Sequence, residues 1–100
     1  MNPFDALEEH YPEIIAAMPT RFNSHEFILK LAHRYQHLYV KALAQYADRD
    51  VSPFQAAHGQ LARRLAKFPH LVRYVGEEPS QHIFGGTTEV ALWRRVKETN

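Results

Sequence analysis

The fold is decided by residues 52–76, SPFQAAHGQLARRLAKFPHLVRYVG, which join a helix to a strand. Ser52 is a favourable N-cap, and Pro53 suits the first helical position, where its missing N–H is not needed. Gln55 would complete a capping box with Ser52. Apolar residues then recur every three or four positions and predict one buried stripe: Phe54, Ala57, Leu61, Leu65 and Phe68. Gly59 weakens this helix and therefore predicts the close approach of another one.

The periodicity changes from that of a helix to that of a strand after Pro69. Residues 71–75 are rich in β-forming side chains, and residues 89–96 alternate again, so two strands are predicted. Turn-forming residues at 77–80 and 85–88 predict a long loop between them. Trp93, in the second of these strands, is interpreted as a core residue rather than a platform for a base.

A long helix is predicted upstream, over residues 23–47. Asn23 and Glu26 have the spacing of a capping box, which marks its start. Its broad apolar face contains Ile28, Leu31, Tyr35, Leu38, Ala42 and Tyr46. Residues 1–22 predict a helical segment broken at Pro12, and the sequence leaves open whether this segment docks on the core.

Together these elements predict an α+β fold of mainly helical character in a single domain, residues 1–100. Three helices are followed by a short antiparallel strand pair, which resembles the element order of a winged helix. That resemblance implies that the third helix reads nucleic acid and that the strand pair forms the wing. It is one of element order only, and the second helix is longer than a compact helix-turn-helix usually has.

The composition, with 45% hydrophobic and 23% charged residues, predicts one modest core. The absence of Cys removes disulfides and thiolate metal sites. No signal peptide or membrane span is recognised, so a cytoplasmic location and no membrane partner are expected. The net charge of +1 hides an asymmetry, because residues 1–26 are mainly acidic while residues 51–76 contain no acid. An acidic end and a basic face are therefore predicted.

The basic residues of two predicted helices are candidate nucleic-acid contacts, because such binding depends on neutralising phosphates. On the long helix the stripe consists of Lys30, Arg34, His37 and Lys41. The third helix contributes Gln55, His58, Arg63, Arg64 and Lys67, and the strands contribute Arg73, with Arg94 and Arg95 as additions. The solvated face of any amphipathic helix carries similar residues, so both interpretations stay open.

Catalysis and metal binding find little support in the sequence. His33 and His37 have a spacing that can place two imidazoles on one metal ion, but no Glu follows His33, and cations lie nearby. No serine lies in a nucleophile motif. We therefore expect no catalytic residue, no cofactor and no metal site.

The leading hypothesis is a small non-enzymatic nucleic-acid-binding module. The alternative is a protein-interaction or self-assembly module, in which the long helix presents Tyr35, Tyr39 and Tyr46 to a protein partner or to a second copy in a homodimer. A metal-binding protein is a distant third hypothesis.

Overall fold

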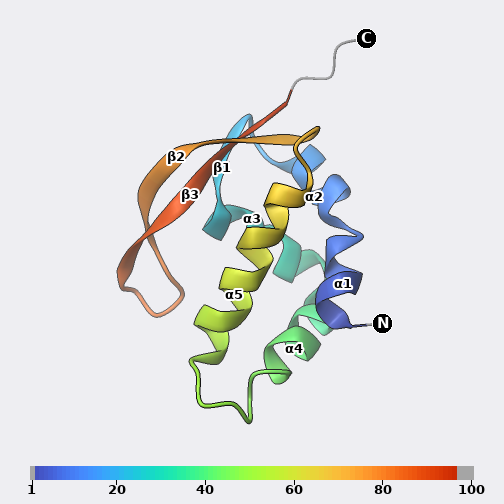
Figure 1. Cartoon of the computed structure of the whole chain (residues 1–100), viewed down its shortest axis with the longest axis vertical. Helices are drawn as coiled ribbons and strands as arrows, with labels where there is room; N and C mark the ends of the chain where they lie inside the picture. Colours follow the sequence, from blue (N-terminus) through green and yellow to red (C-terminus); the bar gives the residue numbers. More distant parts are fainter. Residues whose placement is uncertain (1, 97–100) are drawn as a thin grey trace.

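The computed structural model describes residues 2–96, which form five α-helices and a three-stranded antiparallel sheet (Figure 1). In chain order the elements are α1 (Pro3–Glu8), α2 (Tyr11–Ala17), β1 (Arg21–Asn23), α3 (Ser24–Arg34), α4 (Gln36–Ala44), α5 (Pro53–Arg63), the 3₁₀ turn η1 (Arg64–Lys67), β2 (Val72–Gln81) and β3 (Thr87–Arg95). The α+β class is confirmed, whereas the prediction of three helices and a single strand pair is wrong.

Side-chain capping marks the start of α3 but not that of α5. The Asn23 side chain accepts a hydrogen bond from the Glu26 backbone N at 2.9 Å, and Glu26 Oε1 accepts one from the Asn23 backbone N at 2.8 Å. The capping box predicted at the start of α3 is therefore confirmed. Ser52 is the N-cap of α5 with Pro53 in the first turn, but its side chain makes no capping hydrogen bond. The predicted capping box with Gln55 is therefore wrong.

The predicted long helix is in fact two helices, because the chain leaves the helical conformation at Tyr35 (φ −124°, ψ 56°). The Tyr35 hydroxyl donates to Glu13 Oε1 at 2.5 Å, and its ring stacks on His10 with the ring centroids 3.8 Å apart. These contacts hold Tyr35 against the N-terminal helices, and α4 packs along α1. No Pro or Gly marks the break, so tertiary contacts override the helix propensity here.

The sheet has the strand order β1–β3–β2. Strand β1 was not predicted, and it pairs with β3 through residues 21–23. β2 is longer than predicted, because residues 77–80 continue it instead of forming a loop, and β3 begins at Thr87 instead of residue 89. Pro79 fits there because β2 is an edge strand, where a missing N–H is tolerated. The turn itself is tight, and a side chain at Gly86 would collide with the His82 ring.

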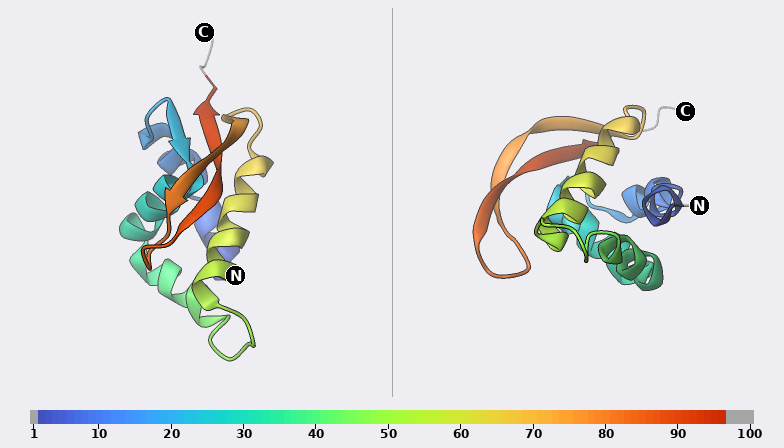
Figure 2. Two further views of the ribbon diagram at one scale, coloured as in Figure 1. Left: turned by 90° about the vertical axis from the view of Figure 1, so that its left-hand side faces the viewer. Right: turned by 60° about the horizontal axis from the view of Figure 1, so that its bottom comes forward.

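A β-bulge curves the long hairpin. The pairing of β2 with β3 shifts between Tyr74 and Gly76, and Gly76 has a φ of 141°, a conformation that favours glycine. Figure 2 shows the strong curvature of the two strands. Near the tip, the Phe84 ring meets the Phe54 ring of α5 edge-on, with the ring centroids 5.3 Å apart. The curved hairpin therefore touches the start of α5.

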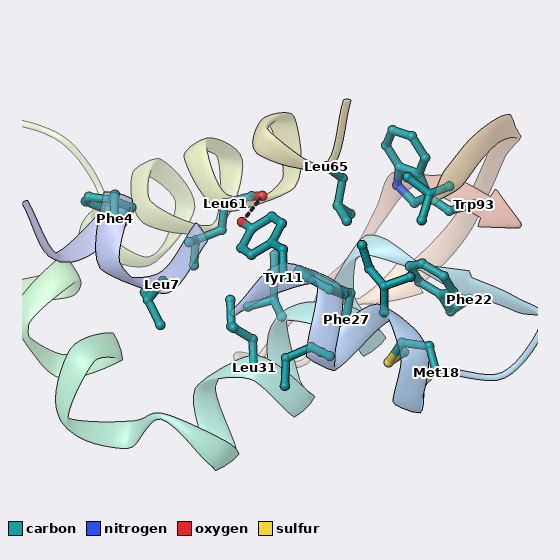
Figure 3. Packing of buried hydrophobic residues seen from close by; sticks show 14 of the residues in the cluster. Phe4, Leu7, Tyr11, Met18, Phe22, Phe27, Leu31, Leu61, Leu65 and Trp93 are labelled. Carbon is teal, nitrogen blue, oxygen red and sulfur yellow. Dashed lines mark hydrogen bonds between the residues drawn. The ribbon is translucent and has the colours of Figure 1, made fainter. Parts of the chain in front are cut away.

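The core lies between the helices and the inner face of the sheet (Figure 3). Tyr11 is fully buried there, and its hydroxyl donates to the Leu61 carbonyl oxygen at 2.5 Å. Burial raises the pKa of Tyr11 far above its usual value, so the hydroxyl stays protonated. Trp93 is buried as predicted, and its Nε1 donates to Ser24 Oγ at 3.1 Å. These hydrogen bonds satisfy polar groups inside an otherwise apolar core.

The N-terminal segment is part of this core. Its buried apolar side chains are Phe4, Leu7, Tyr11, Ile14, Ile15, Met18 and Phe22. Arg64 ties α1 to the end of α5, because its Nη1 lies 2.9 Å from both Asp5 Oδ1 and Glu8 Oε1. The segment therefore docks on the core, which the sequence left open. None of the helices within residues 2–96 has the length and apolar character needed to cross a bilayer.

Candidate functional site

Three arginines stand side by side across the outer face of the sheet. Arg94 of β3 lies opposite Arg21 of β1 on one side and opposite Arg73 of β2 on the other. The next pair along the strands, Phe22 and Trp93, is buried in the core, so the arginines point the other way. All three are exposed, and the left panel of Figure 2 shows the strands in front of the helices. We call Arg21, Arg73 and Arg94 the arginine row.

The arginine row lacks acidic partners within the described part of the chain. No carboxylate oxygen of residues 2–96 lies within 4.0 Å of any of its three side chains. Like charges directly opposite each other on antiparallel strands destabilise a sheet, by about 0.2–1 kcal/mol per pair. Arg94 belongs to two such pairs. The row therefore concentrates positive potential that an anion can neutralise.

Replacing Arg94 with Thr should stabilise the protein in the absence of a ligand. The change removes both like-charged pairs and introduces a good strand former, so we expect the free energy of unfolding to rise by about 0.5–1 kcal/mol. Urea unfolding at low ionic strength measures this gain, which should shrink in 1 M salt as the charges are screened. Arg49→Thr, in the loop before α5, is the control and should bring no gain. A less stable Arg94→Thr protein would show that the row is not under repulsion.

Two of the predicted nucleic-acid contacts, Gln55 and Arg63, lie on the exposed face of α5. A Cβ atom added at Gly59 would lie 3.2 Å from Arg63 Nη1, and no atom of another helix would come within 4 Å. Gly59 therefore leaves room for the Arg63 side chain, and the predicted approach of another helix is wrong. His58 is less available, because its Nε2 lies 2.6 Å from the Tyr39 hydroxyl and the residue is half-buried.

Arg64 and Lys67, which were also predicted to contact nucleic acid, instead bind the acidic residues of α1. Arg64, with 14% of its side chain exposed, is bound by Asp5 and Glu8, and its Nη2 also donates to Gln60 Oε1 at 2.9 Å. Lys67 Nζ lies 3.0 Å from Glu8 Oε1. The acids of α1 thus neutralise two cations of the acid-free stretch, so the predicted acidic end and basic face meet in space and partly cancel.

The basic residues of the predicted long helix do not form one stripe. Lys30 and Arg34 lie on α3, whereas Lys41 lies on α4, beyond the break at Tyr35. Arg34 Nη1 also lies 3.3 Å from Glu13 Oε2. The single stripe is therefore wrong, although Lys30 and Lys41 are both exposed.

Sequence reasoning missed Arg21. Strand β1 has only three residues, which is too short for a period-two pattern to stand out. The signal that exists is the exposed Arg21 followed by the apolar Phe22, just before the N-cap Asn23. Only the pairing of β1 with β3 reveals that Arg21 stands beside Arg94.

Three histidines line a cavity of about 190 Å³ between α3, α5 and the hairpin tip: His25, His58 and His82. His25 Nδ1 lies 2.9 Å from Ser80 Oγ. Burial lowers the pKa of both His25 and His58, and the neighbouring histidines add to this, His82 for His25 and His25 for His58. Within residues 2–96 no group of three or more His, Asp or Glu side chains could hold a metal ion. His33 and His37 lie on different helices.

Acidification should destabilise the protein through His25 and His58. Their pKa values in the folded protein lie below the ordinary value of 6.5, so the unfolded chain takes up protons more readily. The free energy of unfolding should therefore be highest above pH 6.5 and decline as the pH falls below it. Urea unfolding at several pH values measures this decline.

A double variant tests the source of that pH dependence. In His25→Gln/His58→Gln the decline between neutral and mildly acidic pH should be smaller than in the unmodified protein. His33→Gln/His37→Gln is the matched control, because both of these side chains are exposed. An equal decline in all three proteins would rule out His25 and His58 as its cause.

Comparison with family models, with curated proteins and with solved structures finds no match to the chain. The features of interest are the arginine row, the exposed face of α5 and the curved hairpin that touches it.

Proposed function

We propose that the chain is a small nucleic-acid-binding module with a winged-helix-like arrangement, which acts by binding and not by catalysis. The observation that carries the proposal is the arginine row. Arg21, Arg73 and Arg94 are held in register by three strands, are exposed, and have no acidic partner among residues 2–96. Guanidinium groups suit phosphate because they offer several N–H donors in a fixed plane.

The dimensions of the row favour a polyanion over a single carboxylate. Neighbouring strands lie about 4.8 Å apart, so the three Cα atoms span roughly 10 Å. Double-stranded DNA carries one negative charge per about 1.7 Å of its axis, so several phosphates fall within that span. A ligand with one charge would neutralise only part of the row.

The order of the elements supports the same proposal. α5 is followed by the short turn η1 and then by β2, and the hairpin curves round to touch the start of α5 through Phe84. In a helix-turn-helix protein, residues near the start of the recognition helix contact base edges. Gln55 lies in the first turn of α5 and is exposed, and a Gln side chain can bind adenine with two hydrogen bonds. Arg63 lies farther along the same helix, and its exposed guanidinium group is suited to binding a phosphate group of the backbone.

The test is fluorescence anisotropy with labelled duplex and single-stranded oligonucleotides of unrelated sequence, over a series of salt concentrations. We expect binding that is measurable at low salt and weakens steeply as salt rises, because each phosphate contact releases counterions. Affinity weaker than millimolar for every oligonucleotide at low salt would overturn the proposal. Binding that does not respond to salt would also contradict it.

A protein-interaction module is the second candidate, favoured by exposed apolar side chains beside the hairpin tip. Leu29 of α3 is 60% exposed, and Ile83 and Phe84 of the hairpin turn are 46% and 71% exposed. The three tyrosines first considered for this role are engaged inside the chain: Tyr35 with Glu13, Tyr39 with His58 and Tyr46 with Gln60. Light scattering behind a sizing column tests self-assembly, and a strict monomer at high concentration would count against it.

A further inference from the structure

The outer part of the β2–β3 hairpin, residues 77–91, extends beyond the three-stranded part of the sheet. Strand β1 pairs only with residues 92–94 of β3, so within residues 2–96 the strand residues 77–81 and 87–91 pair only with each other. Figure 1 shows this hairpin arm extending past β1. A two-stranded ribbon is at best marginally stable by itself in water, so the hairpin arm depends on its contacts with the helices.

The hairpin arm is loosely packed where it meets α3 and α5. His25 Nδ1 of α3 lies 2.9 Å from Ser80 Oγ of β2. At the tip, the Phe84 ring meets the Phe54 ring of α5 edge-on, yet 71% of Phe84 remains exposed. The cavity of about 190 Å³ lies at the same junction. Atoms that line a cavity lack packing partners on one side, so this junction is weaker than the close-packed core.

Each of the three elements at the junction contributes one histidine: His25 from α3, His58 from α5 and His82 from the hairpin turn. Burial is the main cause that lowers the pKa of His25 and of His58. A charge on His82 lowers the pKa of His25 further, and a charge on His25 does the same for His58. From α4, the group that faces this cluster is the Tyr39 hydroxyl, 2.6 Å from His58 Nε2.

No acid compensates the charge that protonation would bring to this cluster. Within residues 2–96 no carboxylate oxygen lies within 4.0 Å of a nitrogen of the three histidines. The acids of the adjoining segments bond to Asn23 instead: Glu26 Oε1 accepts from its backbone N, and Glu78 Oε2 accepts from its Nδ2 at 2.7 Å. His25 also lies in the first turn of α3, where the helix dipole disfavours a cation.

We propose that the hairpin arm is a pH-sensitive switch, which lies closed on α3 and α5 while His25 and His58 are neutral and is released when they take up protons. The two protons add positive charge beside one small cavity that His82 also lines, and charges repel more strongly where water is scarce. Release of the hairpin arm returns both imidazole rings to water and leaves the core folded.

The direction of the switch follows from the state that binds protons more readily. In the closed protein the pKa of both histidines lies below the ordinary value of 6.5, whereas release returns each pKa towards that value. Closure is therefore favoured above pH 6.5 and is lost as the pH falls below it. An opening that takes up two protons becomes up to about 100-fold more favourable for each unit of decrease in pH.

NMR spectroscopy of the whole chain, without nucleic acid, tests the switch independently of the proposed function. At about pH 8 the rings of Phe84 and Phe54 should show a nuclear Overhauser contact, which should be lost at about pH 5. The backbone amides of residues 82–86 should then gain fast motion. The Trp93 indole N–H should keep its chemical shift, because the core stays folded.

Two results of this measurement would overturn the proposal. The first is a tip contact that persists at about pH 5 although the ring resonances of His25 and His58 show that both are protonated. The second is loss of the tip contact together with the Trp93 signal, because the whole protein would then unfold instead of releasing the hairpin arm.

A double variant assigns the switch to its histidines. His25→Gln/His58→Gln should keep the tip contact at both pH values, whereas the exposed pair His33→Gln/His37→Gln should release the hairpin arm like the unmodified protein. Release of the hairpin arm in the first variant on acidification would overturn the proposal. If that variant does not fold, the unmodified protein decides, because tip release should have the same midpoint as the titration of His25 or His58. A midpoint that matches neither would contradict the proposal.

Discussion

Replacing Arg64 with Ala should lower the free energy of unfolding by about 2–3 kcal/mol and leave nucleic-acid affinity nearly unchanged. Arg64 is 14% exposed and donates to Asp5, Glu8 and Gln60, each at 2.9 Å. Its guanidinium also lies over the Phe4 ring, 5.7 Å from the ring centroid. The substitution removes charge-assisted hydrogen bonds and the packing of a long side chain at once, and so loosens α1 from α5.

The neighbouring residue provides the control for this prediction. Arg63 is exposed, and no carboxylate oxygen of residues 2–96 lies within 4.0 Å of it, so Arg63→Ala should change the free energy of unfolding by less than about 0.5 kcal/mol. Urea unfolding followed by circular dichroism measures both proteins. An Arg64→Ala protein that is as stable as the unmodified protein but loses nucleic-acid binding would contradict the structural role of Arg64.

Removing the whole arginine row should abolish most of the nucleic-acid affinity. In Arg21→Gln/Arg73→Gln/Arg94→Gln three phosphate contacts are lost, which at about 50 mM salt corresponds to a decrease on the order of 10²–10³-fold. The triple variant should fold normally, because the like-charged pairs across the strands disappear with the arginines. Anisotropy measures the affinity, and urea unfolding confirms the fold.

A matched triple variant separates the row from net charge. Lys30→Gln/Lys41→Gln/Arg49→Gln removes the same number of charges from exposed positions on α3, α4 and the following loop. It should reduce affinity far less than the loss of the row. A larger loss in this control would locate the phosphate contacts on the helices, as the sequence first indicated.

The parts of the fold that sequence could predict are those that local interactions determine. The capping box of Asn23 and Glu26 and the proline at the start of α5 involve neighbours in the chain, so their signals are strong. The break at Tyr35 depends on contacts with His10 and Glu13, more than twenty residues away, and no local residue marks it. Strand β1 likewise exists only through its pairing with β3.

The candidate site was predictable in residue type but not in arrangement. Arg73 and Arg94 were recognised as basic strand residues, yet their neighbour Arg21 lies some fifty residues before Arg73 in the chain. Arg64 looked like a surface contact because the acids that bind it belong to α1. Burial and pairing of charges depend on tertiary structure, which is why periodicity alone did not separate the exposed Arg63 from the ion-paired Arg64 and Lys67.

The salt dependence of nucleic-acid binding tests the central claim most directly. The observed association constant of the unmodified protein and of Arg21→Gln/Arg73→Gln/Arg94→Gln should be measured for the same duplex from about 25 to 200 mM salt. Three phosphate contacts contribute about −2.7 to the slope of log K against log salt, so the triple variant should show a slope that is shallower by roughly this amount. Equal slopes for the two proteins would contradict the assignment of the arginine row as the phosphate-binding surface.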